Sequence, residues 1–173
     1  MADVVLDTNI LADFLAQFFG TARRGHASFA KQDTITGELA RKINQIIRWH
    51  DWNLESGEDE EQYPGMVVAS TFAFVEIGRK WTDIVKGRFQ VTQMAAFVEQ
   101  PPEWFAIEPV DENLVVAFCD APTDVLMAHG EMRALEWADA VHIATAFGRG
   151  DDSLLAATDR EMRQVSVLQD RLI

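Results

Sequence analysis

Short apolar runs alternate with longer segments of helical periodicity along this chain of 173 residues. Four of the short runs predict β-strands, at residues 2–6, 66–69, 105–108 and 154–157, and a fifth strand is predicted at 165–168. The run 66–69 has no polar alternation, which is typical of a strand covered on both faces. Strands that alternate with helices predict an α/β fold, with a parallel sheet and helices on both of its faces.

The longer segments carry apolar side chains three or four positions apart, the spacing of one helix face. In the segment 9–19, for example, Ile10, Phe14 and Phe18 form such a stripe. Further helices are predicted at 34–53, 71–86, 91–99, 111–119, 123–130 and 132–147. The length suits a single domain over residues 1–173, with an extended helical and acidic-loop segment at about 20–65.

The chain is strongly acidic, with 28 Asp and Glu residues against 15 Lys and Arg and a formal net charge of -13. This excess disfavours a protein whose whole surface binds nucleic acid or anionic membranes through basic charge. It does not exclude a local site that binds a phosphate through metal ions. Residues 55–61 hold five acids and no base, which we interpret as a solvated surface loop.

The single cysteine, Cys119, excludes an internal disulfide framework and indicates a reducing compartment. The first residues lack a basic start, and Asp3 and Asp7 interrupt their apolar character, so no signal peptide is predicted. The best apolar run, 66–75, is shorter than the about 20 residues that span a bilayer. We therefore expect a cytoplasmic protein that makes no membrane contact.

Four acids occur where the surrounding pattern predicts the protein interior: Asp7, Glu76, Asp139 and Asp159. Asp7 and Asp159 each follow a predicted strand, whereas Glu76 and Asp139 lie in apolar helical segments. A buried ionised carboxylate is costly unless it is paired or binds a metal, and Mg²⁺ and Mn²⁺ prefer oxygen ligands. Because ligands of open α/β sheets bind outside the carboxyl ends of the strands, we predict a metal site there.

Each acid also has a simpler interpretation. Asp7 and Asp159 can cap helices that begin just after them. Glu76 can pair with Lys80 or with Arg79 on an exposed helix face, a contact worth only about 0.2–0.5 kcal/mol. Asp139 is the hardest to explain in this way, because the residues one and two turns further along its predicted helix are apolar.

The sequence around these acids resembles the PIN-domain nucleases, the family that includes the VapC-type toxins of toxin–antitoxin pairs. Four motifs carry the resemblance, at residues 4–11 (VVLDTNIL), 69–78 (ASTFAFVEIG), 139–146 (DAVHIATA) and 155–159 (LAATD). The resemblance implies a single PIN-like domain whose five parallel strands follow the order 3-2-1-4-5. That order places the first and fourth strands side by side.

The resemblance also implies a metal-dependent endoribonuclease of the kind that serves as the toxin of a toxin–antitoxin pair. Asp7, Glu76, Asp139 and Asp159 would be catalytic and would hold one or two Mg²⁺ or Mn²⁺ ions, while Thr8, Asn9 and Thr158 would orient ligands or water. No organic cofactor is expected. The implied partners are an RNA substrate, an antitoxin protein and a second copy of the chain in a homodimer.

Other residues near these motifs have two interpretations each. Glu136 is either an auxiliary acid or, as we favour, the surface partner of Arg133. His142 is expected to be packed or exposed rather than catalytic. The bases that could bind a substrate are Arg23, Arg24, Lys31, Arg79, Lys80, Lys86 and Arg88. Each of them is also an ordinary surface residue by its local pattern.

Two other functions compete with the nuclease. Mg²⁺-dependent phosphatases that form an aspartyl-phosphate also place an Asp after the first strand, but they need a second Asp two residues later, where this chain has Asn9. A non-catalytic PIN-like module for RNA or protein binding is the other alternative. Metal binding separates such a module from an enzyme.

Overall fold

The computed structural model describes residues 2–21, 27–56, 65–120, 124–126, 132–162, 165, 168 and 170–173. The strands in this part of the chain are β1 (Val4–Leu6), β2 (Val67–Ser70), β3 (Phe105–Glu108), β4 (Asp124–Leu126), β5 (Met132–Ala134) and β6 (Leu154–Ala156). The helices are α1 (Thr8–Thr21), α2 (Gly37–Ser56), α3 (Thr71–Arg79), α4 (Trp81–Ile84), α5 (Val91–Glu99), α6 (Glu112–Asp120) and α7 (Trp137–Gly148).

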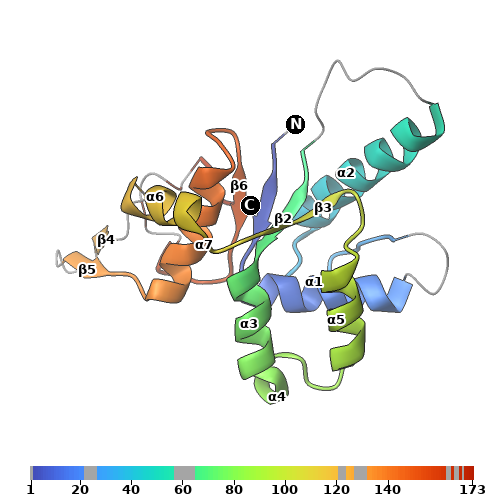
Figure 1. The fold of residues 1–173 in the computed structure, drawn as a ribbon, viewed down its shortest axis with the longest axis horizontal. Helices are drawn as coiled ribbons and strands as arrows, with labels where there is room; N and C mark the ends of the chain where they lie inside the picture. Colours follow the sequence, from blue (N-terminus) through green and yellow to red (C-terminus); the bar gives the residue numbers. More distant parts are fainter. Residues whose placement is uncertain are drawn as a thin grey trace.

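Four strands form a parallel sheet in the order β3-β2-β1-β6 (Figure 1). This is the order 3-2-1-4 that was predicted for the first four strands. β1 and β6 are direct neighbours, with Val5 opposite Leu155. The chain therefore leaves both strands at the same edge of the sheet, and Asp7 and Asp159 follow at that edge.

Helices cover both faces of the sheet, as predicted (Figure 1). Val4 and Leu6 pack into a core shared with α1, α2, α3 and α5, whereas Val5 packs into a core shared with α6 and α7. This division follows from the two-residue period of a strand. Because β1 is buried on both sides, Asp7 is the first position after it where the chain can place a carboxylate.

Helix α2 occupies much of the predicted segment 20–65. Its apolar stripe, Ile43, Ile46 and Ile47, is buried in the core on the α1 side of the sheet. The hydroxyl of Thr36 accepts the N–H of Leu39 at 3.1 Å and so caps the start of the helix. Residues 57–61 of the predicted acidic loop, and the bases Arg23 and Arg24, lie outside the described residues.

The two helices predicted at 123–130 and 132–147 are wrong at residues 124–126 and 132–134, which form strands. β4 and β5 pair in antiparallel fashion, and α7 begins only at Trp137. All three residues of β5 are exposed, so this stretch has no apolar face that a helix would bury. Continuous burial resumes from Ala140 to Ala146. Residues 127–130 of the first predicted helix are outside the described part of the chain.

The fifth strand predicted at 165–168 is not formed by its two described residues. Val165 and Leu168 are both buried, and their N–H groups donate to the carbonyls of Met162 and Val165, three positions back. A strand would turn residues three apart to opposite faces, whereas a tight turn buries both on one side. Leu172 instead forms a parallel bridge with Leu155 at the outer edge of β6.

The helix predicted at 71–86 is divided into α3 and α4 at Lys80. Lys86 and Gly87 then take positive φ angles of 51° and 73°, a left-handed geometry that cannot continue a helix. Within the described residues, no helix combines the length and apolar character needed to cross a membrane.

Candidate functional site

One cavity at the carboxyl ends of β1 and β6 gathers all the residues that the sequence assigned to the site. This acidic cavity has a volume of about 260 Å³. The predicted residues that line it are Asp7, Thr8, Asn9, Glu76, Asp139, Thr158 and Asp159. The other lining residues are Lys80, Ile84, Arg133, Glu136, Ala138, His142 and Glu161.

Asp7 is held on both carboxylate oxygens and is almost fully buried. Its Oδ1 accepts the N–H of Ile10 at 2.7 Å, which caps α1 as the simpler interpretation predicted. Its Oδ2 accepts the N–H of Thr158 at 2.7 Å and the hydroxyl of Thr158 at 3.1 Å. The carboxylate is therefore a helix cap and a fixed acceptor in the acidic cavity at once.

Glu76 reaches the acidic cavity from α3, between a base and a hydroxyl. Its Oε1 accepts Lys80 Nζ at 2.6 Å, and its Oε2 accepts the hydroxyl of Thr8 at 2.5 Å. Burial alone would raise the pKa of Glu76, but the hydrogen bonds from Lys80 and Thr8 outweigh it and hold the pKa below its usual value. Glu76 is therefore ionised at neutral pH.

His142 extends this contact into the core. Its Nε2 lies 3.1 Å from Thr8 Oγ1, and because the one hydroxyl proton of Thr8 goes to Glu76, Nε2 must be the donor. Burial lowers the pKa of His142, against the opposing pull of Asp7 and Glu76, so the ring is neutral with its proton on Nε2. Its Nδ1 is buried and has no hydrogen-bond partner among the described residues.

Asp139 lies in the first turn of α7, not in the helix interior that the sequence predicted. The helix begins later than expected, because residues 132–134 form β5. Burial, followed by the charges of Asp159, Glu136, Asp7 and Glu76, raises the pKa of Asp139 to about 6. This carboxylate accepts no hydrogen bond from the described residues.

Asp159 and Thr158 form the β6 side of the acidic cavity. Asp159 Oδ1 accepts the N–H of Glu161 at 2.5 Å, which closes a turn rather than capping a regular helix. Asn9 Nδ2 lies 3.4 Å from Thr158 Oγ1 and donates to it. Thr158, just after β6, thus contacts both Asp7 and Asn9 at the start of α1.

The bases at the acidic cavity are already paired. Lys80 contacts Glu76, and Arg133 contacts Glu161 at 3.0 Å. The predicted pair of Arg133 with Glu136 is therefore wrong, because Arg133 lies in β5 and is not a helical neighbour of Glu136. Glu136 instead lines the cavity and contributes to the raised pKa of Asp139.

The donor set suits a hard divalent cation, since carboxylates and hydroxyls supply oxygen ligands. Within the described residues, however, no three acidic, histidine or cysteine side chains are already arranged to hold one ion. Asp7, Glu76 and Asp159 are engaged in hydrogen bonds with the protein. A bound cation would have to draw these carboxylates together, and Asp139 has no such bond to break.

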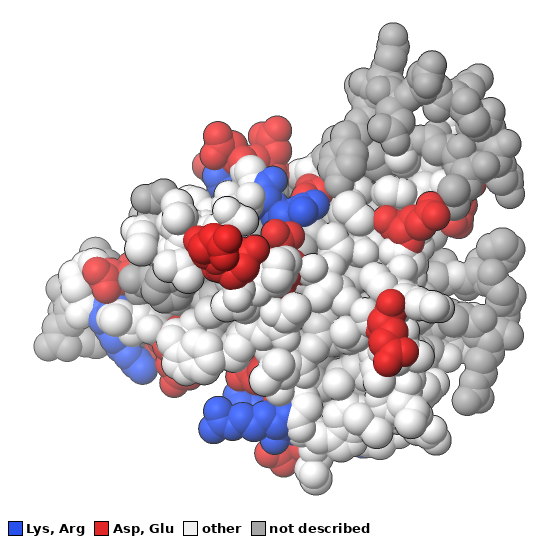
Figure 2. Space-filling model, in the orientation of Figure 1, with Lys and Arg blue, Asp and Glu red and all other residues white. Residues whose placement is uncertain are grey.

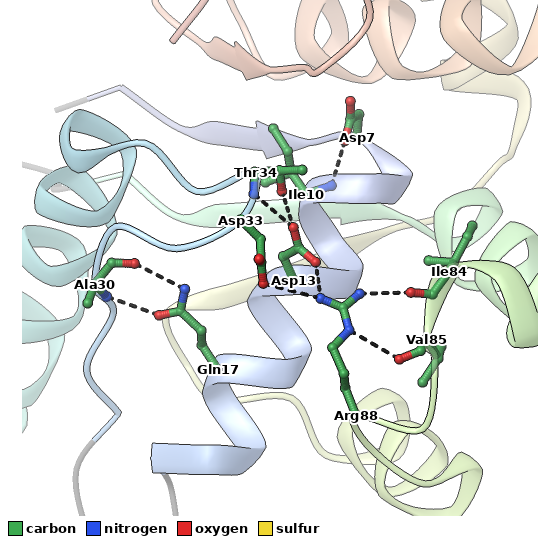
Figure 3. Close-up of polar contacts among 10 residues, drawn as sticks. All are labelled: Asp7, Ile10, Asp13, Gln17, Ala30, Asp33, Thr34, Ile84, Val85 and Arg88. Carbon is green, nitrogen blue, oxygen red and sulfur yellow. Dashed lines mark hydrogen bonds and ion pairs between the residues drawn. The ribbon is translucent and has the colours of Figure 1, made fainter.

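A second cavity, the intermediate cavity, adjoins the first and shares Asn9, Ile84 and Thr158 with it. Asp13 and Arg88 form an ion pair in its wall (Figure 3). Asp13 also accepts the N–H and the hydroxyl of Thr34, at 2.9 and 2.5 Å.

Arg88 binds further groups around this pair. It donates to the carbonyls of Ile84 and Val85 at 2.8 and 3.1 Å, and it lies 3.7 Å from Asp33. This Asp13–Arg88 clamp joins α1, the segment that precedes α2 and the loop after α4 (Figure 3). It therefore fixes Ile84, which lines both cavities.

The face shown in Figure 2 carries separate acidic clusters, and its described Lys and Arg side chains form small groups close to acids. Arg79 is exposed and lines neither cavity. Of the predicted substrate-binding bases that lie in the described part of the chain, only Lys80 lines the acidic cavity, while Lys86 and Arg88 line the intermediate one. An extended basic surface is absent from the described residues on this face.

Comparison with protein-family models finds no match to this chain, and comparison with curated protein sequences finds none either.

Proposed function

We propose that this protein is a metal-dependent endoribonuclease that hydrolyses phosphodiester bonds of RNA in the acidic cavity. The observation that carries the proposal is the convergence of four carboxylates from separate segments on one cavity, where burial and repulsion raise the pKa of Asp139 to about 6. Such a cluster is costly unless a cation offsets its charge. The resemblance of the four motifs to PIN-domain nucleases supports the same chemistry.

The chain's own residues would divide the work as follows. Asp7 offers a fixed oxygen, because the Ile10 and Thr158 bonds hold its carboxylate in place. Glu76 remains ionised, and Asp139 and Asp159 complete the acidic ligand set. A bound Mg²⁺ or Mn²⁺ ion would lower the pKa of a bound water and offset charge on the phosphate.

The first experiment measures cleavage of single-stranded RNA by the purified protein with Mg²⁺ or Mn²⁺, with and without a chelator. We expect cleavage that stops on chelation and that is lost in Asp7→Asn, because this change removes the central charged oxygen. Asp152→Asn is the matched control, since Asp152 is exposed and lines neither cavity. Unchanged metal-dependent cleavage by Asp7→Asn would contradict the assignment of the site.

The two competing functions make different predictions. An aspartyl-phosphate phosphatase needs an acid–base group where Asn9 stands, and the Asn9 amide instead donates to Thr158; a trapped phosphoenzyme would favour this class. A non-catalytic module should bind no divalent ion specifically. Calorimetric titration of the metal-free protein with Mn²⁺ therefore separates the module from the nuclease.

A further inference from the structure

A basic groove, opposite in charge to the acidic cavity, lies between α2 and residues 29–31. This basic groove has a volume of about 410 Å³ and is lined by Lys31, Arg41 and Arg48, with no acid among its lining residues. All three bases are exposed. Within the described residues they form no ion pair or hydrogen bond. In a chain with a net charge of -13, such a group of bases marks a local site for anions.

The wall of the basic groove is held by two side-chain amides. Asn44 binds both backbone groups of Phe29, at 2.9 and 2.8 Å. Gln17 binds both backbone groups of Ala30, each at 3.0 Å (Figure 3). These reciprocal pairs fix the backbone next to Lys31, so the groove is formed before any ligand arrives.

Each described base that lines the acidic cavity is already paired with an acid, whereas the bases of the basic groove are not. Lys80 and Arg133 are each paired with a glutamate at the acidic cavity, and Arg88 is paired with Asp13. These bases are already neutralised. Lys86, which lines the intermediate cavity, is exposed and has no partner among the described residues. A polyanion that enters the acidic cavity therefore meets unpaired cations only beyond it, first at Lys86 and then at the basic groove.

Helix α1 connects the three cavities. Asn9, Asp13 and Gln17 are four positions apart and so share one face of the helix. Asn9 lines the acidic and intermediate cavities, Asp13 lines the intermediate cavity, and Gln17 holds the wall of the basic groove. Figure 3 shows this succession along α1, from Asp7 through Asp13 to Gln17. Asp7 and Gln17 are about 15 Å apart along the helix axis.

We propose that the basic groove binds backbone phosphates of the RNA strand several nucleotides away from the cleaved bond. The strand follows α1 from the acidic cavity, across the intermediate cavity, to Lys31, Arg41 and Arg48. This inference rests on the proposed function, and it names the substrate as a single strand long enough to reach both ends of α1. The acidic and intermediate cavities adjoin, and Gln17 ties the wall of the basic groove to the same helix, an arrangement along α1 that favours an extended RNA strand over an acidic protein as the ligand.

The test compares RNA binding by Arg41→Gln/Arg48→Gln with binding by the matched pair Lys42→Gln/Arg79→Gln. Both variants lose two charges, but Lys42 and Arg79 do not line the basic groove. Fluorescence anisotropy is measured in an Asp7→Asn background, with a long single-stranded RNA and with a dinucleotide, over a range of salt concentrations.

We expect the groove variant to bind the long RNA at least about tenfold more weakly, with a salt slope lower by about 1.4, because each neutralised phosphate of a single strand contributes about 0.7. Dinucleotide binding should not change. The control pair should retain the affinity and slope of the parent. Equal losses in both pairs, or no loss in either, would overturn the proposal.

Two further outcomes are decisive. If the groove variant binds RNA normally but loses binding to polyglutamate, the groove recognises an acidic protein and the RNA proposal is wrong. If Asp7→Asn leaves cleavage intact, the proposed function fails, while the anisotropy measurement still decides what the basic groove binds.

Discussion

The hydroxyl of Thr8 links the core of this protein to the charged face of the acidic cavity. It donates to Glu76 and accepts from His142, which joins three residues of three different helices. The neutral His142 thus fixes the hydroxyl proton, and the hydroxyl fixes the carboxylate. Such partners orient metal ligands and influence affinity although they do not touch the ion.

Thr8→Val is predicted to weaken Mn²⁺ binding by about 10-fold or more, because Glu76 loses its orienting donor. It should also lower the free energy of unfolding by about 1–3 kcal/mol, since Nε2 of the buried His142 loses its acceptor. Calorimetry with Mn²⁺ and urea unfolding measure the two effects. Thr8→Ser keeps the hydroxyl and should behave as the parent. Equal Mn²⁺ affinities for Thr8→Val and Thr8→Ser would contradict the role of the hydroxyl.

Asp139→Asn is predicted to stabilise the metal-free protein at pH 8 while weakening its Mn²⁺ binding. The pKa of Asp139 is about 6 in the folded chain against an ordinary 3.8, so the folded state disfavours the ionised form. The stability linked to this carboxyl is present at low pH and is lost as the pH rises through 6.

The substitution removes that loss, so the melting temperature should rise at pH 8 and match the parent near pH 4. Scanning calorimetry at both pH values, with Asp152→Asn as control, checks this. A lower melting temperature for Asp139→Asn at pH 8 would show that the carboxylate is stabilised, not repelled.

Four acids of the cavity were predictable because their signal is local, whereas Glu161, which also lines the cavity, was missed. Asp7 and Asp159 follow apolar strands, and the order of those strands brings their ends together. His142 carries no such signal, because its partner Thr8 is 134 positions away in the sequence. The raised pKa of Asp139 was equally out of reach, since it depends on burial and on charges that include Asp159, Asp7 and Glu76 from three other segments.

At the scale of elements, the Asp13–Arg88 clamp holds together three segments that share no regular pairing. Asp13 is 6% exposed, so its charge depends on Arg88 and Thr34 for compensation. The clamp sets the position of the loop after α4 relative to α1. That position determines the wall between the acidic and intermediate cavities.

Arg88→Leu is predicted to lower the free energy of unfolding by about 1–3 kcal/mol, because it leaves Asp13 buried without its cation. The double variant Asp13→Leu/Arg88→Leu should lose less than the sum of the single changes. Urea unfolding of the four proteins measures this coupling. Arg79→Leu, at an exposed base without a described partner, is the control. Additive losses would mean that the pair is not coupled.

The elements predicted correctly are those whose apolar period is uniform, such as 91–99 and 105–108. The errors fall where spacing alone is ambiguous. Residues 132–134 continue the sequence pattern of α7 but are exposed in β5. The short apolar run 165–168 suggested a strand, although the three-residue spacing of Val165 and Leu168 also fits a turn.

At the scale of the whole molecule, the acidic and basic side chains are concentrated at different places on the surface, in addition to the overall excess of acids. The acidic cavity and the basic groove lie toward opposite ends of α1. The face in Figure 2 shows further acidic clusters that would repel a polyanion. If the proposed function holds, a substrate with many phosphates would therefore follow a path from the proposed cation site to the bases of the basic groove.

The small bridge between Leu172 and Leu155 has a consequence for self-association. The N–H of Leu155 donates to the carbonyl of Arg171 at 2.7 Å, and its carbonyl accepts the N–H of Ile173 at 3.2 Å. These bonds occupy backbone groups that β6 would otherwise present at an open sheet edge. An open edge is a template on which a strand of another molecule can pair. By covering this edge, residues 171–173 hinder aggregation through strand pairing on this side of the sheet.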